Sequence, residues 1–172
     1  MKKLQGIAGA LVCLSLVSAA PAAADPVVDW NAIAAQVIGA GGRPGPSGIL
    51  DFAVVQLAVH DAVQSIEHRF ETYGPGVPHA NGSTIAAAAR AASLVLETRF
   101  PAQAAAIETM FTNYLAANGL LGTNPGVSVG QQAALGIIAL RANDGSFPAG
   151  FPPFTGGTAA GEWRPTPNFQ AP

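Results

Sequence analysis

The sequence predicts an all-α protein: a bundle of about five helices that follows a signal peptide and leads into an irregular C-terminal tail rich in proline and glycine. Three observations favour this fold class. Apolar residues recur at helical spacing in five segments, strand-like alternation of apolar and polar residues is missing, and groups of glycine and proline separate the segments. The chain of 172 residues is long enough for one such domain.

Residues 1–24 have the three parts of a secretory signal peptide. Two lysines form the basic region, residues 4–17 form the apolar region, and the alanines 22–24 provide a cleavage site of small residues before Asp25. We therefore expect export to the periplasm or the extracellular space, with no stable membrane span after signal cleavage. The alternative is an uncleaved anchor, but the apolar region is short for a span of about 20 residues.

The composition of the mature chain excludes several kinds of chemistry. The single cysteine, Cys13, lies within the signal peptide, so the mature chain has no disulfide and no thiolate metal site. Both lysines also lie there, and six arginines against ten acidic side chains give the mature chain a net charge of −4. This balance argues against nucleic acid as a partner, because nucleic-acid binding needs clustered basic residues.

The first predicted helix covers residues 29–39. Asp29 is its expected N-cap, and the glycines at 39, 41 and 42 end it. A loop over residues 41–48 follows, because glycine and proline punctuate this stretch.

The second predicted helix, residues 49–73, has the strongest periodicity of the chain. One apolar stripe is formed by Phe52, Val55, Val59, Val63, Ile66, Phe70 and Tyr73. A second apolar face is formed by Leu50, Val54 and Leu57. We therefore expect a central helix with neighbours on both faces. A narrow polar stripe runs along it and is formed by Gln56, His60, Gln64, Glu67 and Glu71.

Three further helices are predicted beyond the loop of residues 72–82. The third begins at Ser83 or Thr84, which are good N-cap residues, and ends at Arg99. The fourth has Pro101 in its first position and ends at the Asn118–Gly119 pair. The inward-facing residues of these two helices are Ile85, Ala88, Ala92, Val95 and Leu96, then Ile107, Met110, Phe111 and Tyr114.

The fifth predicted helix begins at Ser128, which forms a capping box with Gln131, and ends near residues 143–145. Its buried set is Val129, Ala133, Ile137 and Leu140. The organisation is thus a signal peptide over residues 1–24, a helical domain over residues 25–146, and an irregular linker over residues 147–172.

The candidate polar residues for chemistry are His60, Asp61 and Glu67, and we expect all three to be structural. His60 and His68 are two helical turns apart and cannot share one metal ion, since ligands on one helix need a spacing of three or four residues.

Asp61 lies on an apolar face of the second helix, so its carboxylate must be paired or hydrogen-bonded. The expected partner is an arginine, either Arg90, Arg99 or Arg141, or else a loop amide. The alternative is a helical enzyme that uses Asp61 together with His60 and Glu67.

Five motifs occur in the same order as in a known family. They are DWNAIA (29–34), AVHDAVQSIE (58–67), YGPG (73–76), ALRANDGS (139–146) and GEWRPTPN (161–168). In this order they resemble the N-terminal helical region of bacterial vanadium-dependent haloperoxidases, which belong to the type 2 phosphatidic acid phosphatase superfamily. The resemblance implies that vanadate or phosphate is held in the full-length protein by a lysine, two arginines and a Ser-Gly-His segment, with a second histidine as vanadium ligand or nucleophile. It implies halide oxidation by peroxide, or phosphate ester hydrolysis.

The residues of this chain depart from that oxyanion-binding pattern. Ile49 follows Ser47-Gly48 where the family has histidine, and Gly157 stands seven residues before Arg164 where the family has lysine. We therefore expect no catalytic, cofactor-binding or metal-binding residue and no cofactor in this chain, with vanadate implied only for the full-length family.

The expected function is that of an inactive piece whose partner is a catalytic half beyond the W-R-P-T-P linker. His60 and Asp61 match a histidine and an aspartate in the helical region of the family, and the resemblance implies a structural role for both. The alternative function is an exported, non-enzymatic helical module that binds a protein partner.

Overall fold

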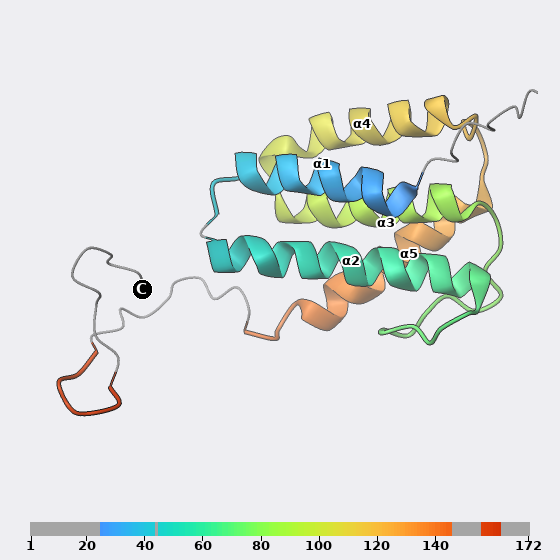
Figure 1. Ribbon diagram of the computed structural model, residues 1–172. Helices are drawn as coiled ribbons and strands as arrows, with labels where there is room; N and C mark the ends of the chain where they lie inside the picture. The colour runs from blue at the N-terminus through green and yellow to red at the C-terminus, as the bar shows by residue number, and fades with distance from the viewer. Residues whose placement is uncertain (1–24, 44, 146–155, 163–172) are drawn as a thin grey trace, which may run out of the picture.

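The computed structural model describes residues 25–43, 45–145 and 156–162, and the predicted signal peptide and most of the predicted linker lie outside them. The described residues form five α-helices and one short 3-10 helix, and they contain no strand (Figure 1). The helices are α1 (Pro26–Ala40), α2 (Gly45–Glu67), α3 (Thr84–Arg99), η1 (Pro101–Gln103), α4 (Ala104–Ala117) and α5 (Pro125–Arg141). The predicted all-α fold class is therefore confirmed.

Helix α3 lies at the centre of the bundle, where it contacts α1, α2, α4 and α5. Alanine has a high helix propensity and a small side chain, so an alanine-rich helix can be approached closely on several sides. The fully buried alanines of α3 are Ala86, Ala87, Ala88, Ala89, Ala91 and Ala92. Helix α2 contacts α1, α3 and α5, so its predicted neighbours on both apolar faces are confirmed. The helix enclosed on most sides, however, is α3 and not α2.

Helices α1 and α5 begin earlier than the sequence predicts, and both do so for the same reason. Asp25 precedes Pro26 and accepts hydrogen bonds from the backbone of residues 27 and 28, so Asp25 and not Asp29 is the N-cap of α1. Asn124 precedes Pro125 and accepts from the backbone of Gly126, so Asn124 and not Ser128 caps α5. An Asx residue that can cap, followed by proline in the first helical position, outcompetes a later capping residue.

Helix α2 is shifted toward the N-terminus relative to its predicted bounds, since it begins at Gly45 and ends at Glu67. Phe70 and Tyr73, predicted on its apolar stripe, lie instead in the following loop with 65% and 56% of their surfaces exposed.

Leu140 was predicted to be buried in α5, but 52% of its surface is exposed. The predicted N-cap Ser83 is confirmed, because its hydroxyl accepts a hydrogen bond from the backbone of Ala86.

Helix α2 is also the one described helix that is long and apolar enough to cross a membrane by length and composition. Half of its most apolar window is buried inside the bundle. It carries two buried carboxylates, Asp51 and Asp61, which are 0% and 1% exposed. Within the bundle, α2 packs against α1, α3 and α5.

The contact between α3 and α5 depends on glycine in α5. A Cβ atom added at Gly130 would overlap the carbonyl oxygen of Ala87 and meet the backbone nitrogen of Ala91 at 3.0 Å. The same addition at Gly136 would meet only Pro75, at 3.6 Å, which is an ordinary contact. The two helices therefore touch backbone to backbone at Gly130.

This difference predicts opposite effects of one substitution within α5. Gly130→Ala should lower the free energy of unfolding by about 1 to 3 kcal/mol, because the added methyl group forces the helices apart. Gly136→Ala should raise it by up to about 1 kcal/mol, because alanine favours the helix more than glycine does. Urea denaturation measures both, and equal stability of the two variants would contradict the close approach.

Candidate functional site

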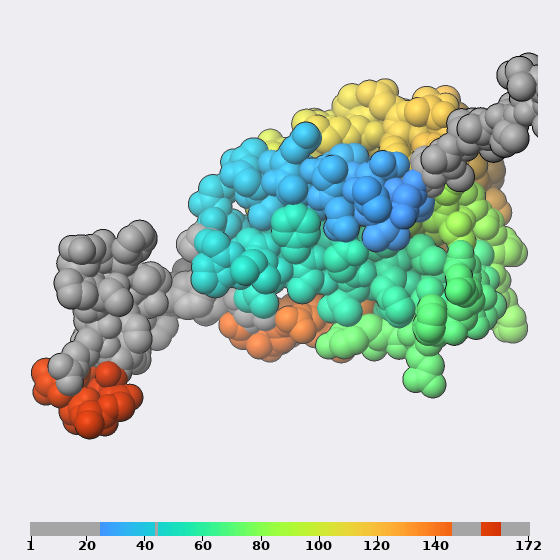
Figure 2. Space-filling view, in the orientation of Figure 1, coloured from blue at the N-terminus to red at the C-terminus, as the bar shows by residue number. Residues whose placement is uncertain are grey.

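The candidate site is a loop, residues 68–78, that the C-terminal half of α2 holds with four polar side chains. We call this segment the anchored loop (Figure 2, green). Its anchors are His60, Asp61, Gln64 and Ser65, which bind the backbone of the loop directly. The spacing of these positions places them on one face of the helix. Two of the four anchors, His60 and Gln64, belong to the predicted polar stripe, whereas Asp61 was predicted on an apolar face. All four are hydrogen-bonding partners of the loop.

Asp61 makes the central anchor. Its two carboxylate oxygens accept from the backbone nitrogens of Tyr73 and Gly74, at 2.6 and 2.8 Å. The side chain is buried, so these charge-assisted hydrogen bonds satisfy a carboxylate that would otherwise be costly to bury. The loop-amide alternative predicted for Asp61 is thus confirmed, and the ion-pair alternative is wrong.

The other three anchors lie on both sides of Asp61. The amide oxygen of Gln64 accepts from the backbone of Arg69 and Phe70 at 3.2 and 2.9 Å, and the Ser65 hydroxyl accepts from Val77 at 2.9 Å. His60 Nε2 lies 2.9 Å from the carbonyl oxygen of Glu71. A carbonyl oxygen can only accept, so this contact requires a proton on Nε2. Each hydrogen bond fixes one more point of the loop backbone.

The anchors also explain where α2 ends. His68 adopts φ of +54° and its N–H binds the carbonyl oxygen of Gln64, which is the left-handed C-terminal cap that more often contains glycine. The next two backbone N–H groups, those of Arg69 and Phe70, bind the Gln64 side chain instead of helical carbonyls. Local side-chain hydrogen bonds therefore compete successfully with continuation of the helix.

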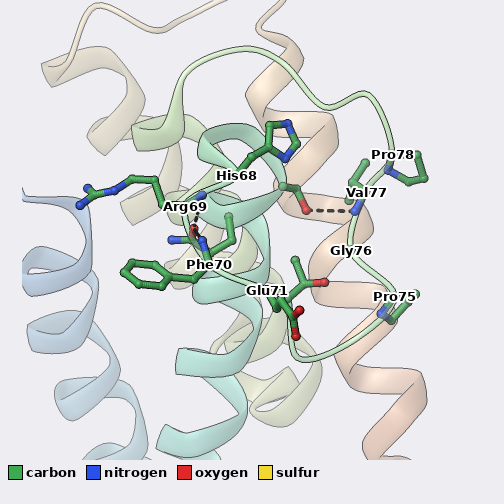
Figure 3. A pocket seen from close by; sticks show the side chains of 11 residues that line it. His68, Arg69, Phe70, Glu71, Pro75, Gly76, Val77 and Pro78 are labelled. Atoms are coloured by element: carbon green, nitrogen blue, oxygen red, sulfur yellow. Dashed lines mark hydrogen bonds between the residues drawn. The ribbon is translucent and has the colours of Figure 1, made fainter.

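The anchored loop surrounds a hollow of about 470 Å³. Figure 3 shows His68 and Glu71 on one arm of the loop and Pro75, Val77 and Pro78 on the other. Gln64 and Ser65 of α2 also line the hollow. The side chains of His68 and Arg69 are exposed and so are the rings of Phe70 and Tyr73. The hollow thus combines apolar walls with polar side chains of both charges.

The three candidate residues do not come together as one catalytic set. His60 and Asp61 both serve the anchored loop, whereas Glu67 is exposed and its nearest charged partner is Arg69, at 3.9 Å. In the described residues no group of three or more histidine, cysteine, aspartate or glutamate side chains is arranged to hold a metal ion.

Asp51 is a second buried carboxylate, which was not predicted from the sequence as a candidate residue. Arg99 Nε donates to one of its oxygens at 2.8 Å, and Arg43 Nε lies 3.1 Å from the other. The Arg43 guanidinium also donates to the Arg99 carbonyl oxygen at 2.7 Å and lies 4.9 Å from the centre of the Phe100 ring. This cluster ties the start of α2 to the end of α3. Asp51 could have been found in the sequence, because it lies among the apolar positions of the second predicted helix, as Asp61 does.

A second charge cluster joins α3 to α4. The Arg90 guanidinium lies 3.2 Å from the carboxylate of Glu97 and 3.0 Å from that of Glu108, and 5.2 Å from the centre of the Phe111 ring. Burial raises the pKa of Glu97, Arg90 lowers it, and the nearby carboxylate of Glu108 raises it, with a net upward shift from the ordinary value of 4.5. The folded protein therefore holds a proton on Glu97 more tightly than the unfolded chain does.

The residues that the structure describes do not fit a bound vanadate or phosphate. Ser47 and Gly48, which imitate the family segment, are buried in the first turns of α2, and a Cβ added at Gly48 would meet the Ile38 side chain at 3.2 Å. A hollow of about 450 Å³ at the other end of α2 is lined by Arg99 and Arg141, but each arginine already pairs with an aspartate. The described arginines thus serve ion pairs within the fold.

Comparison of the chain with protein-family models, with curated proteins and with solved structures finds no match.

The anchoring role of Asp61 predicts a loss of stability on substitution. Asp61→Asn should lower the free energy of unfolding by about 2 kcal/mol or more, because one buried backbone N–H then faces an amide donor instead of an oxygen. Glu67→Gln, on the exposed side of the same helix, should change it by less than about 0.5 kcal/mol. Chemical denaturation checks both values. An Asp61→Asn variant as stable as Glu67→Gln would contradict the anchor.

The raised pKa of Glu97 predicts a pH-dependent stability difference. The contribution of Glu97 to folding is present in acid and is lost as the pH rises from about 4.5 upward, since the folded state binds the proton more tightly. The free energy of unfolding of Glu97→Gln, relative to wild type, should therefore increase between pH 4 and pH 7. Denaturation over this range measures the trend, with Glu67→Gln as a control for the loss of one charge. A constant or falling difference would argue against the shift.

Proposed function

We propose that the chain is the exported helical scaffold region of a protein similar to vanadium-dependent haloperoxidases and type 2 phosphatidic acid phosphatases, and that it performs no oxyanion chemistry itself. One observation carries the proposal. Asp61, in the motif AVHDAVQSIE, accepts the backbone N–H groups of Tyr73 and Gly74, in the motif YGPG. Two motifs on which the resemblance depends are thus two halves of one structural contact.

Other residues of these motifs are also used within the fold. Trp30 is fully buried and packs edge-on against Tyr114 with ring centres 5.8 Å apart, while the Tyr114 hydroxyl donates to the Asp29 carboxylate at 2.9 Å. Arg141 pairs with Asp144 in the motif ALRANDGS at 2.6 Å. Side chains that maintain a fold are what a scaffold region requires, whereas a catalytic region would direct polar groups at a substrate.

The proposal predicts that the purified 172-residue chain is inactive. Neither vanadate-dependent oxidation of bromide by hydrogen peroxide nor hydrolysis of p-nitrophenyl phosphate should exceed the rate without protein, because the described residues do not present the set of donors that stabilises the reacting oxyanion. Dye bromination and nitrophenolate release measure the two activities. Saturable activity that Asp61→Asn abolishes at unchanged stability would instead support the helical-enzyme alternative.

A second candidate function is an exported interaction module, favoured by the anchored loop. Its backbone is held at several points while Phe70, Tyr73 and Arg69 remain exposed. Aromatic and arginine side chains dominate protein interfaces, and a loop that is already ordered loses little entropy on binding. The coding frame beyond codon 172 separates the two candidates. A frame that continues with a lysine, Ser-Gly-His and a later histidine supports the scaffold, whereas a stop followed by unrelated sequence supports the module.

A further inference from the structure

We propose that Asn81 is a site of spontaneous deamidation, and that the fold protects the chain's other Asn-Gly pair, Asn118–Gly119, from the same reaction. The sequence contains only these two Asn-Gly pairs. Glycine after asparagine favours the reaction because the missing side chain lets the backbone nitrogen approach the asparagine amide closely.

The reaction is intramolecular and needs only water. The backbone nitrogen of Gly82 attacks Cγ of Asn81, a C–N bond forms, and Nδ2 leaves as ammonia with the proton lost from the Gly82 nitrogen. Water then opens the resulting succinimide at either carbonyl. One product is aspartate, and the other is isoaspartate, in which the main chain is longer by one methylene group.

The two pairs differ in what holds their reacting atoms. Asn81 and Gly82 are both exposed in the loop before α3, and no hydrogen bond within the described residues holds the Asn81 amide or the Gly82 nitrogen. At the second pair, Nδ2 of Asn118 donates to the carbonyl oxygen of Tyr114 at 2.9 Å. The backbone nitrogen of Gly119 donates to the carbonyl oxygen of Ala116 at 3.1 Å. Both hydrogen bonds must open before Gly119 can attack.

Reaction at Asn81 would place a negative charge where two helices begin. The Ser83 nitrogen donates to the Asn124 side chain at 3.4 Å, which joins the start of α3 to the start of α5. Helix N-termini carry partial positive charge, so an aspartate at position 81 suits this place. Isoaspartate does not, because Gly82 lies so close to the backbone of Gly126 that even an added Cβ atom would overlap it.

The test is incubation of the folded 172-residue chain at pH 8 and 37 °C, followed by peptide mass spectrometry. The +1 Da product should accumulate at Asn81 at least about tenfold faster than at Asn118, because two hydrogen bonds protect the second pair. Equal rates, faster reaction at Asn118, or no product at Asn81 would each overturn the proposal.

Two controls separate the fold from the local sequence. In 6 M guanidinium chloride the ratio of the two rates should fall to about one, because the hydrogen bonds at Asn118 are lost on unfolding; an unchanged ratio would overturn the role of the fold. Asn81→Asp introduces the charge without lengthening the main chain, so it should keep the wild-type midpoint of urea denaturation. The isoaspartate-containing fraction should unfold at lower urea, and a midpoint equal to that of Asn81→Asp would refute the backbone contact at Gly126.

Discussion

The close approach of α3 and α5 sets the dimensions of the whole bundle. Because Gly130 has no side chain, α5 approaches the backbone of Ala87 in α3 directly. The small side chains of the alanines on the other faces of α3 likewise allow α1, α2 and α4 to pack closely against it. Alanine buries little apolar area per residue, so the bundle depends on the many short contacts that close packing provides. This explains how a chain with few large apolar side chains at its centre can still form a compact core.

Hydrogen bonds to buried carboxylates hold distant segments of this protein together, as disulfides do in other proteins. Residues 25–172 contain no cysteine, and the segments that leave the helices are held instead by Asp51 and Asp61. Asp51 joins two segments through arginines, and Asp61 holds the loop through backbone N–H groups. Asp51 reaches Arg99, 48 residues away, and Asp61 reaches Gly74, 13 residues away, so both stabilise the tertiary structure and not one helix alone.

The sequence was sufficient to predict five helices because apolar periodicity is a local property. Helix starts were wrong where Asp25–Pro26 and Asn124–Pro125 supplied a better cap than the expected residue. The end of α2 was wrong for a different reason, since the acceptors that stop it, Asp61 and Gln64, act on backbone groups up to 13 residues away. The periodicity of apolar residues does not indicate hydrogen bonds between such distant positions. For the same reason Asp61 was identified as buried but with several possible partners, and the pairing of Asp51 was not foreseen.

The burial of Trp30 gives the protein an internal optical reporter. The chain has two tryptophans, and Trp30 lies fully enclosed at the contact of α1 with α4, with its ring edge-on to Tyr114. Indole emission shifts to longer wavelength when water reaches the ring, so separation of α4 from α1 would change the fluorescence spectrum even if the other helices stayed together. The outermost contacts of the bundle can thus be followed apart from its alanine-rich centre.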